Sequence, residues 1–328
     1  MSDKPITDRI IKASAVIALA HLILKMAGLI QAKAGAHYMS TSEYEAILVV
    51  AFDGVILALF FIGEEVIGPS FLPVFLKEKD DKGEDAAWLF TSIFVSIQFI
   101  ILIVVVSILM LFPDFIISVL TKWSPEENPN RYPLLKESIV WLAPSLICLS
   151  LGSTTYMLLN GYKKFFLAAI GDAAWKFCVV IALVVGIGIF NYDYKAILFG
   201  LLIGSLAKLI THLFGLLSHL TRFRVSFNWN NPAMKTVLLL ILPLLAGILF
   251  AKFRDIFNNV YVLSGISSSV KGGSEGLMQA NNLGKKLFDG INAIVPYAIH
   301  IALLPFFCEL VDQKDTRKLG ELISKCIR

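Results

Sequence analysis

Positively charged side chains interrupt several long apolar segments of this sequence. A charge in the hydrocarbon core of a bilayer costs several kcal/mol, so such residues normally face a water-filled cavity, a partner charge or a bound ion. A membrane protein with this many cations in its apolar segments is expected to bind something anionic. The residues that lie inside or at the edge of such a segment are Lys25, Lys176, Lys208, Lys252, Arg254, Lys285 and Lys286.

The segment 278–308 carries a stripe of polar residues. Asn282, Lys285 and Asp289 recur at three- and four-residue spacings, which places them on one helix face, with Lys286 beside it. Two interpretations stay open. Asp289 forms an ion pair with one of the two lysines between packed helices, or the stripe lines a polar cavity.

The segment 233–262 repeats this pattern on a smaller scale. Lys252 and Asp255 share one helix face, and Arg254 lies on another. Both segments therefore combine the length of a membrane-crossing helix with charges that a lipid-facing helix would not carry.

Composition places the chain among integral membrane proteins. Hydrophobic residues make up 57% of the chain and charged residues only 16%, whereas soluble domains carry about 25% charged residues. The net charge of +4 is not gathered in a basic stripe, which argues against a nucleic-acid partner. There is no C-x-x-C pair and no catalytic or nucleotide-binding signature, so the sequence predicts no enzyme, no metal site and no cofactor.

Windows of about 20 apolar residues predict an all-α integral membrane protein with eight transmembrane helices. The second helix is expected to continue as a kinked extension to about Leu76, broken at Gly68-Pro69 and Pro73, because proline removes a backbone donor. The predicted spans are 10–32, 44–63, 88–112, 134–160, 165–190, 195–220, 233–262 and 278–308.

Loop charges predict the orientation of these spans. Sixteen Lys and Arg residues fall in the termini and the loops on the same side, and six fall in the opposite loops. Because cytoplasmic loops carry the excess of basic residues, both the N-terminus and the C-terminus are expected in the cytoplasm.

Three stretches of the sequence resemble the MviN/MurJ family, the lipid II flippases of the MOP exporter superfamily. Gly63–Phe90 reads GEEVIGPSFLPVFLKEKDDKGEDAAWLF, with an acidic-glycine turn, a phenylalanine-rich F-x-P and a short charged loop. Leu142–Gly171 is similar to the hairpin of the family's fourth and fifth helices. Leu277–Arg328, with ALLP at 302–305 and a trailing charged segment, is similar to the end of the eighth helix.

The resemblance implies a MOP-exporter-like fold. Residues 1–220 are expected to form the first six-helix lobe, and residues 221–328 two helices of a truncated second lobe with a cytoplasmic tail. Family members have fourteen helices, so the chain is expected to be a shortened member, one half of a split pair or a partner subunit, with a companion chain completing the second lobe.

The resemblance also implies a function and a site. The chain is expected to be a flippase-like, multi-pass protein of the bacterial cytoplasmic (inner) membrane, moving a lipid-linked pyrophosphate peptidoglycan precursor outward by alternating access. The family's first-helix arginine falls on Lys25 and its eighth-helix arginine on Lys286, while the acid that starts helix two falls on Glu43 or Glu45. Besides membrane lipids, the expected partner is this lipid-linked pyrophosphate. The candidate substrate-binding residues are Lys25, Lys286, Lys285, Lys252, Arg254 and Asp289.

Two alternatives to this function stay open. The chain could be a non-transporting scaffold or partner subunit derived from the same family, which the replacement of planar arginines by lysines favours. It could also export another lipid-linked polysaccharide. A scaffold predicts bound protein partners and silent substitutions of Lys25 and Lys286, whereas a flippase predicts a bound polyprenyl-pyrophosphate lipid.

Overall fold

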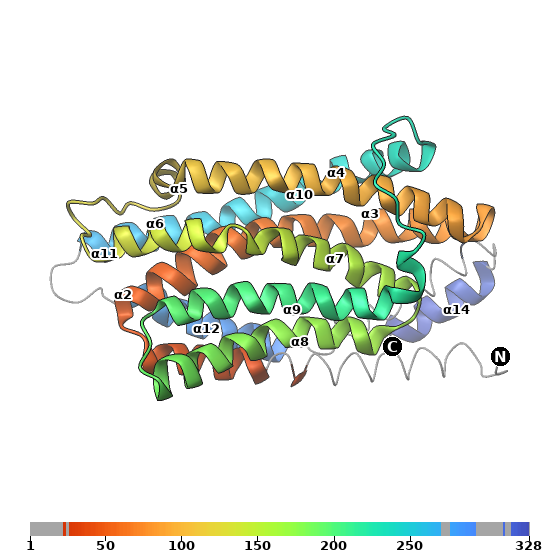
Figure 1. Ribbon diagram of the computed structural model, residues 1–328. Coiled ribbons are helices and arrows are strands. Elements are labelled where there is room, and N and C mark those ends of the chain that lie inside the picture. The colour runs from red at the N-terminus through yellow and green to blue at the C-terminus, as the bar shows by residue number, and fades with distance from the viewer. Residues whose placement is uncertain (1–21, 24–25, 270–275, 293–310, 312–315, 328) are drawn as a thin grey trace.

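The computed structural model describes residues 22–23, 26–269, 276–292, 311 and 316–327. All regular structure in these residues is helical. Long helices run side by side along one axis, and the connections between them gather at two ends (Figure 1). We call these the α2 end, which includes residues 39–41, 121–130 and 190–194, and the α14 end, which includes residues 162–164 and 221–231.

The helices have the following bounds, and each η segment is a stretch of π-helix that continues an α-helix. After helical residues 26–38 come α2 Thr41–Glu43, η1 Tyr44–Leu57, α3 Ala58–Lys82, α4 Glu84–Leu111, α5 Pro113–Leu120, α6 Arg131–Leu142, α7 Ser145–Gly161, α8 Phe165–Ile181, η2 Ala182–Ile189, α9 Lys195–Leu220, α10 Pro232–Ile256, η3 Phe257–Val262, α11 Leu263–Ser269, α12 Leu277–Asn292 and α14 Thr316–Ile327.

Six of the predicted spans coincide with helices of the structure. Within the described residues, five helices are long and apolar enough to cross a membrane, or six when α6 and α7, bent by 46° at Pro144, are taken as one span. The predicted spans 10–32 and 278–308 lie largely outside the described residues, so the number eight stays a prediction. The matching helices are Thr41–Lys82, Glu84–Leu111, Arg131–Leu142 with Ser145–Gly161, Phe165–Ile189, Lys195–Leu220 and Pro232–Ile266.

The expected break in the second span is wrong. Pro69 and Pro73 lie inside α3, which runs without interruption to Lys82. The aromatic rings on this stretch explain the continuity, because Phe71 is fully buried and stacks on Phe90 of α4, with ring centroids 5.2 Å apart. Packing of this face against α4 and α7 offsets the hydrogen bonds that the prolines cannot make.

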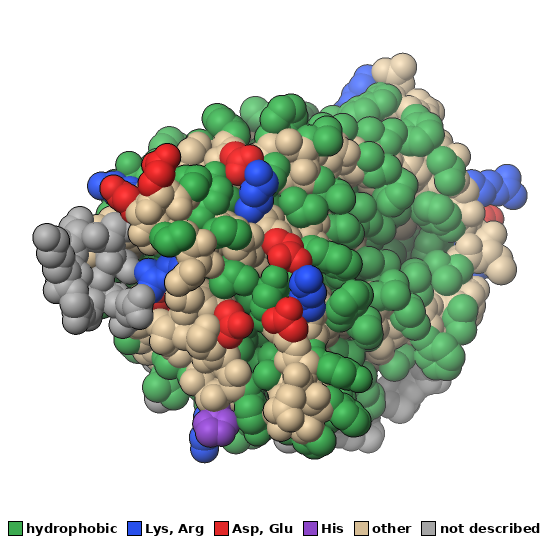
Figure 2. Space-filling view, turned by 60° about the vertical axis from the view of Figure 1, so that its left-hand side comes forward, with side chains coloured by type: hydrophobic (Ala, Val, Ile, Leu, Met, Phe, Trp, Pro, Cys, Tyr) green, Lys and Arg blue, Asp and Glu red, His purple; other side chains and the backbone are tan. Residues whose placement is uncertain are grey.

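The part of the chain after residue 221 docks on the helix formed by α2, η1 and α3. Ala233, Met234 and Val237, in the first turns of α10, are buried in the same core as the α3 aromatics. Further along, η3 and α12 pack against η1. Figure 2 shows the α2 end coming forward, with charged side chains of both signs among apolar ones and a largely hydrophobic flank beside them.

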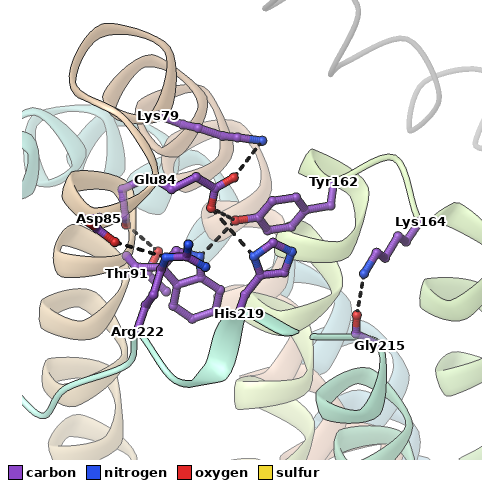
Figure 3. Close-up of polar contacts among 11 residues, drawn as sticks. Lys79, Glu84, Asp85, Thr91, Tyr162, Lys164, Gly215, His219 and Arg222 are labelled. Atoms are coloured by element: carbon purple, nitrogen blue, oxygen red, sulfur yellow. Dashed lines mark hydrogen bonds and ion pairs between the residues drawn. The ribbon is translucent and has the colours of Figure 1, made fainter. Parts of the chain in front are cut away.

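A polar network joins three helices and one connection at the α14 end (Figure 3). The Tyr162 hydroxyl donates to Glu84 at 2.7 Å and accepts from Nε1 of Trp88 at 2.9 Å. Nζ of Lys79 lies 3.4 Å from Glu84, and the His219 ring stacks on Tyr162 with centroids 4.1 Å apart. The network therefore links α3, α4 and α9 to the connection between α7 and α8.

Replacing Tyr162 with Phe tests this network. Burial and the neighbouring Glu84 carboxylate raise the pKa of the Tyr162 hydroxyl, so it donates at neutral pH. We expect the variant to lose about 1–3 kcal/mol of stability, because the Glu84 carboxylate loses one hydrogen bond and the Trp88 indole N–H loses its acceptor. Thermal unfolding in detergent measures this, with Tyr192→Phe, at a residue 62% exposed, as control. Equal melting temperatures for both variants would contradict the expectation.

Candidate functional site

An ion pair and an amide join α12 to η1. Nζ of Lys286 lies 3.0 Å from Oδ2 of Asp53, and Nδ2 of Asn282 donates to the same oxygen at 2.9 Å. The Tyr44 hydroxyl donates to Oδ1 of Asn282 at 3.4 Å. The side chains of Lys286 and Asp53 keep 28% and 24% of their surface exposed. A partly exposed ion pair between apolar helices needs water or a polar ligand beside it.

The structure gives Lys286 a partner that the sequence did not suggest. The sequence left open an ion pair of Asp289 with Lys285 or Lys286 and a cavity-lining stripe, and both stay predictions, while the structure pairs Lys286 with Asp53 on another helix. The side chain of Asp289 and the whole of Lys25 lie outside the described residues. Lys285, the next residue on α12, is exposed. Sequence reasoning missed Asp53, although an acid inside the apolar run 44–63 is the same signal that singled out the lysines.

Lys252 also forms an ion pair between the part of the chain after residue 221 and the earlier helices. Its Nζ lies 2.5 Å from Oε1 of Glu65 on α3 and 5.0 Å above the Phe61 ring. Arg254 faces elsewhere, with 72% of its side chain exposed and Asp255 of its own helix 3.7 Å away. The structure therefore places Lys252 and Lys286 between the two parts of the chain and leaves Arg254 on the surface.

The carboxylate of Glu45 caps the start of α12. Glu45 is fully buried, and its Oε1 accepts the backbone N–H groups of Gly276 and Met278 at 3.1 and 3.2 Å. Arg131 of α6 lies 3.2 Å from its other oxygen. The first N–H groups of a helix lack intrahelical partners and carry partial positive charge, so an ionised carboxylate is favoured there. Glu43 has a local role instead, closing a capping box with Ser40.

A second contact joins distant segments at the α2 end. The backbone N–H of Lys122, in the connection between α5 and α6, donates to Oγ of Ser264 on α11 at 3.0 Å. Nζ of Lys122 also lies 5.2 Å above the ring of Tyr261 on η3. Together with Glu45, these contacts tie η3, α11 and α12 to the earlier helices at this end.

Comparison with a known family identifies the chain. A family described as "Lipid II flippase MurJ" matches residues 35–328. The chain belongs to the MurJ family. This confirms the resemblance read from the three sequence stretches and makes the chain a multi-pass protein of the bacterial inner membrane, in a family of flippases.

A solved structure supports the fold of this MurJ-family chain. The crystal structure of a point mutant of the Vibrio cholerae MATE transporter VcmN matches it with a TM-score of 0.67 and 12% sequence identity, covering 97% of this chain and 68% of that one. A search of curated proteins gave no match. At such low identity the likeness concerns the fold alone, which is that of a MOP-like membrane protein.

Metal ligands are not gathered in the part of the MurJ-family chain that the structure describes. No group of three His, Cys, Asp or Glu residues there could hold a metal ion. The charged groups described between the two parts pair as cation and anion, as Lys286 does with Asp53 and Lys252 with Glu65.

Proposed function

We propose that this MurJ-family chain moves a lipid-linked pyrophosphate precursor of peptidoglycan across the inner membrane by alternating access. The observation that carries the proposal is the partly exposed Lys286–Asp53 pair between α12 and η1. A lysine held by a carboxylate can exchange that carboxylate for a phosphate oxygen, because both are anionic acceptors of a charge-assisted hydrogen bond.

The remaining candidate residues would support this exchange in different ways. Lys25 of the first helix is proposed to bind the second phosphate, while Lys252 and Lys285 add positive potential that is stronger away from bulk water. Arg254, on the surface, is proposed to contribute only at long range. Asp289, one turn beyond Lys285 and Lys286, is proposed to orient their ammonium groups.

The two proposed domains move against each other in this scheme. Residues 1–220 form the first lobe, and residues 221–328 supply the moving helices of the second. The excess of basic residues at the α14 end supports placing that end in the cytoplasm. The contacts of Glu45 and Lys122 then close the external side, and the precursor would enter from the cytoplasmic side before these contacts open.

Replacing Lys25 and Lys286 together with Ala tests the site. We expect the double variant to lose binding of undecaprenyl pyrophosphate at least about tenfold, since two phosphate-binding charges at roughly 1 kcal/mol each are removed. Native mass spectrometry of the detergent-solubilised chain measures the bound lipid. Lys195→Ala, at an exposed lysine paired with Glu137, is the matched control. Unchanged lipid binding in a correctly inserted double variant would refute the assignment.

The outer face of α10 favours a second candidate function, a scaffold that pairs with a companion chain. Leu239 and Phe250 on this helix are 76% and 78% exposed. In the apolar stretch of 18 residues within the span Pro232–Ile266, only 6% of the residues are buried inside the structure. A photo-crosslinker in place of Leu242, at 72% exposure, is then expected to capture one protein that completes the second lobe. Capture of lipid alone, as expected for the same probe at Ile203 of α9, would argue against the companion chain.

A further inference from the structure

Charged residues also lie inside the first lobe, away from the contact with α10 and α12. Lys208, near the middle of α9, has a side chain only 2% exposed, and its Nζ lies 2.6 Å from Oδ1 of Asp172 on α8. The same Nζ lies 4.7 Å above the Phe60 ring. One turn along α9, His212 is completely buried. One helix thus projects two basic side chains into the middle of a membrane-embedded bundle.

Two glycines make room for these side chains. A Cβ on Gly171 of α8 would collide with Nε2 of His212, and a Cβ on Gly152 of α7 would lie 3.1 Å from Cε of Lys208. A larger residue at position 171 would displace the imidazole. The packing of α7, α8 and α9 is therefore shaped around Lys208 and His212.

The surroundings of His212 suit two protonation states. Its Nδ1 lies 2.9 Å from the carbonyl oxygen of Gly152 and its Nε2 lies 3.0 Å from that of Ala168. Carbonyl oxygens only accept, so both contacts are hydrogen bonds when both ring nitrogens carry protons. Oγ1 of Thr155 lies 3.2 Å from Nδ1. In the neutral ring this hydroxyl can donate to Nδ1 while Nε2 keeps its bond to Ala168.

Charge balance provides a place for one extra proton. Glu64 of α3 is half-buried and close enough to interact with both Lys208 and Asp172. With both carboxylates ionised and Lys208 protonated, these residues carry one net negative charge, and a proton on His212 or a carboxylate neutralises it. Neutrality is favoured because an uncompensated charge is costly in a medium of low dielectric constant.

Other titratable groups lie around this cluster. Tyr156 of α7 packs its ring near His212, with centroids 5.9 Å apart. Glu65 of α3 and Lys252 of α10 neutralise each other. Lys176, one turn beyond Asp172, extends toward Gly28 in the first helix.

We propose that Glu64, Asp172, Lys208 and His212 form a proton-binding site inside the first lobe. One exchangeable proton is shared between His212 and the two carboxylates, and Lys208 is the permanent cation. The proton comes from hydronium in the solvent at Glu64 or Asp172, the two members that keep some exposed surface; it binds to a carboxylate oxygen or an imidazole nitrogen and leaves a water molecule behind. Since the adjacent Glu65 holds Lys252, the site adjoins the contact between the two parts of the chain. The proposal is independent of the transported lipid.

The site is tested by nitrogen-15 NMR of the chain, labelled at histidine and reconstituted in nanodiscs. The titration runs between about pH 5 and 9, the range around the ordinary pKa of histidine. His212 is observed alone after replacement of His21, His37, His219 and His300 by Gln. We expect its two nitrogens to report loss of one proton within this range. Glu64→Gln removes a negative charge and should move the midpoint at least about half a pH unit lower, while Glu126→Gln, at an exposed acid near the α2 end, should not move it.

A second pair of variants keeps His212 in place and changes only its neighbour. Thr155→Val removes the hydroxyl that serves the neutral ring, so the midpoint should move to higher pH, whereas Thr155→Ser keeps the hydroxyl and should leave the midpoint near that of the parent. His212 nitrogens that stay in one state throughout the titration would overturn the proposal. The proposal would also be overturned if neither Glu64→Gln nor Thr155→Val shifted the midpoint of the His212 titration.

Discussion

The Asp53→Asn variant is expected to bind undecaprenyl pyrophosphate about fivefold more tightly than the parent chain. The Asp53 carboxylate pairs with the ammonium group of Lys286 at 3.0 Å, so a phosphate that binds Lys286 has to displace this carboxylate. The amide keeps the shape of the side chain and a hydrogen bond to Asn282 but has no charge, and a partly exposed ion pair of this kind contributes about 1 kcal/mol. Titration of the lipid into detergent-solubilised chain, followed by native mass spectrometry, measures the affinity.

Asp114→Asn is the matched control for that experiment. Asp114 also pairs with a lysine, because Nζ of Lys136 lies 2.8 Å from its Oδ2, but it lies on α5 with its side chain 56% exposed. Its replacement is expected to leave lipid binding unchanged. Weaker binding by Asp53→Asn would mean that Asp53 holds Lys286 in place for the lipid and does not compete with it, which would contradict the exchange that we propose.

The Glu45→Gln variant is expected to open the α2 end. Glu45 is fully buried between Arg131 and the start of α12, and removing one partner of a buried ion pair costs about 3–5 kcal/mol. Even about 3 kcal/mol changes the ratio of closed to open conformations roughly a hundredfold. Spin labels at positions 126 and 266, with the native cysteines replaced by Ser, report the separation by double electron–electron resonance.

The neighbouring acid offers a control for this prediction. Glu43→Gln changes the same charge in the same turn but affects only the capping box with Ser40, so the spin-label distances should stay those of the parent chain. Glu45→Gln should add a population at longer distances. Identical distance distributions for both variants would mean that Glu45 does not hold the α2 end closed.

The two predictions concern different steps of the proposed cycle. Asp53 lies beside the cation that would bind the pyrophosphate, whereas Glu45 holds the end through which the lipid would leave. A change in lipid affinity without a change in the spin-label distances, and the reverse, would show that binding and opening are separable in this MurJ-family chain.

The sequence alone predicted the membrane class, six of the spans and the family. These features follow from local rules, because a helix that crosses a bilayer needs an apolar run of a certain length and charged residues stand out in such a run. The break at Pro69 and Pro73 was wrong for a related reason. A local rule for proline ignores the packing of Phe71 against α4, which keeps α3 continuous.

Only the tertiary structure decided which charges meet. Asn282 and Asp53 are 229 positions apart, and Glu45 reaches the start of α12 across 233 positions. Helical periodicity places a residue on one face of its own helix, but it does not specify which helix packs against that face or in what register. The packing of distant helices therefore determines the partner of Lys286, the cap on α12 and the surroundings of His212. These contacts could be identified only from the folded chain.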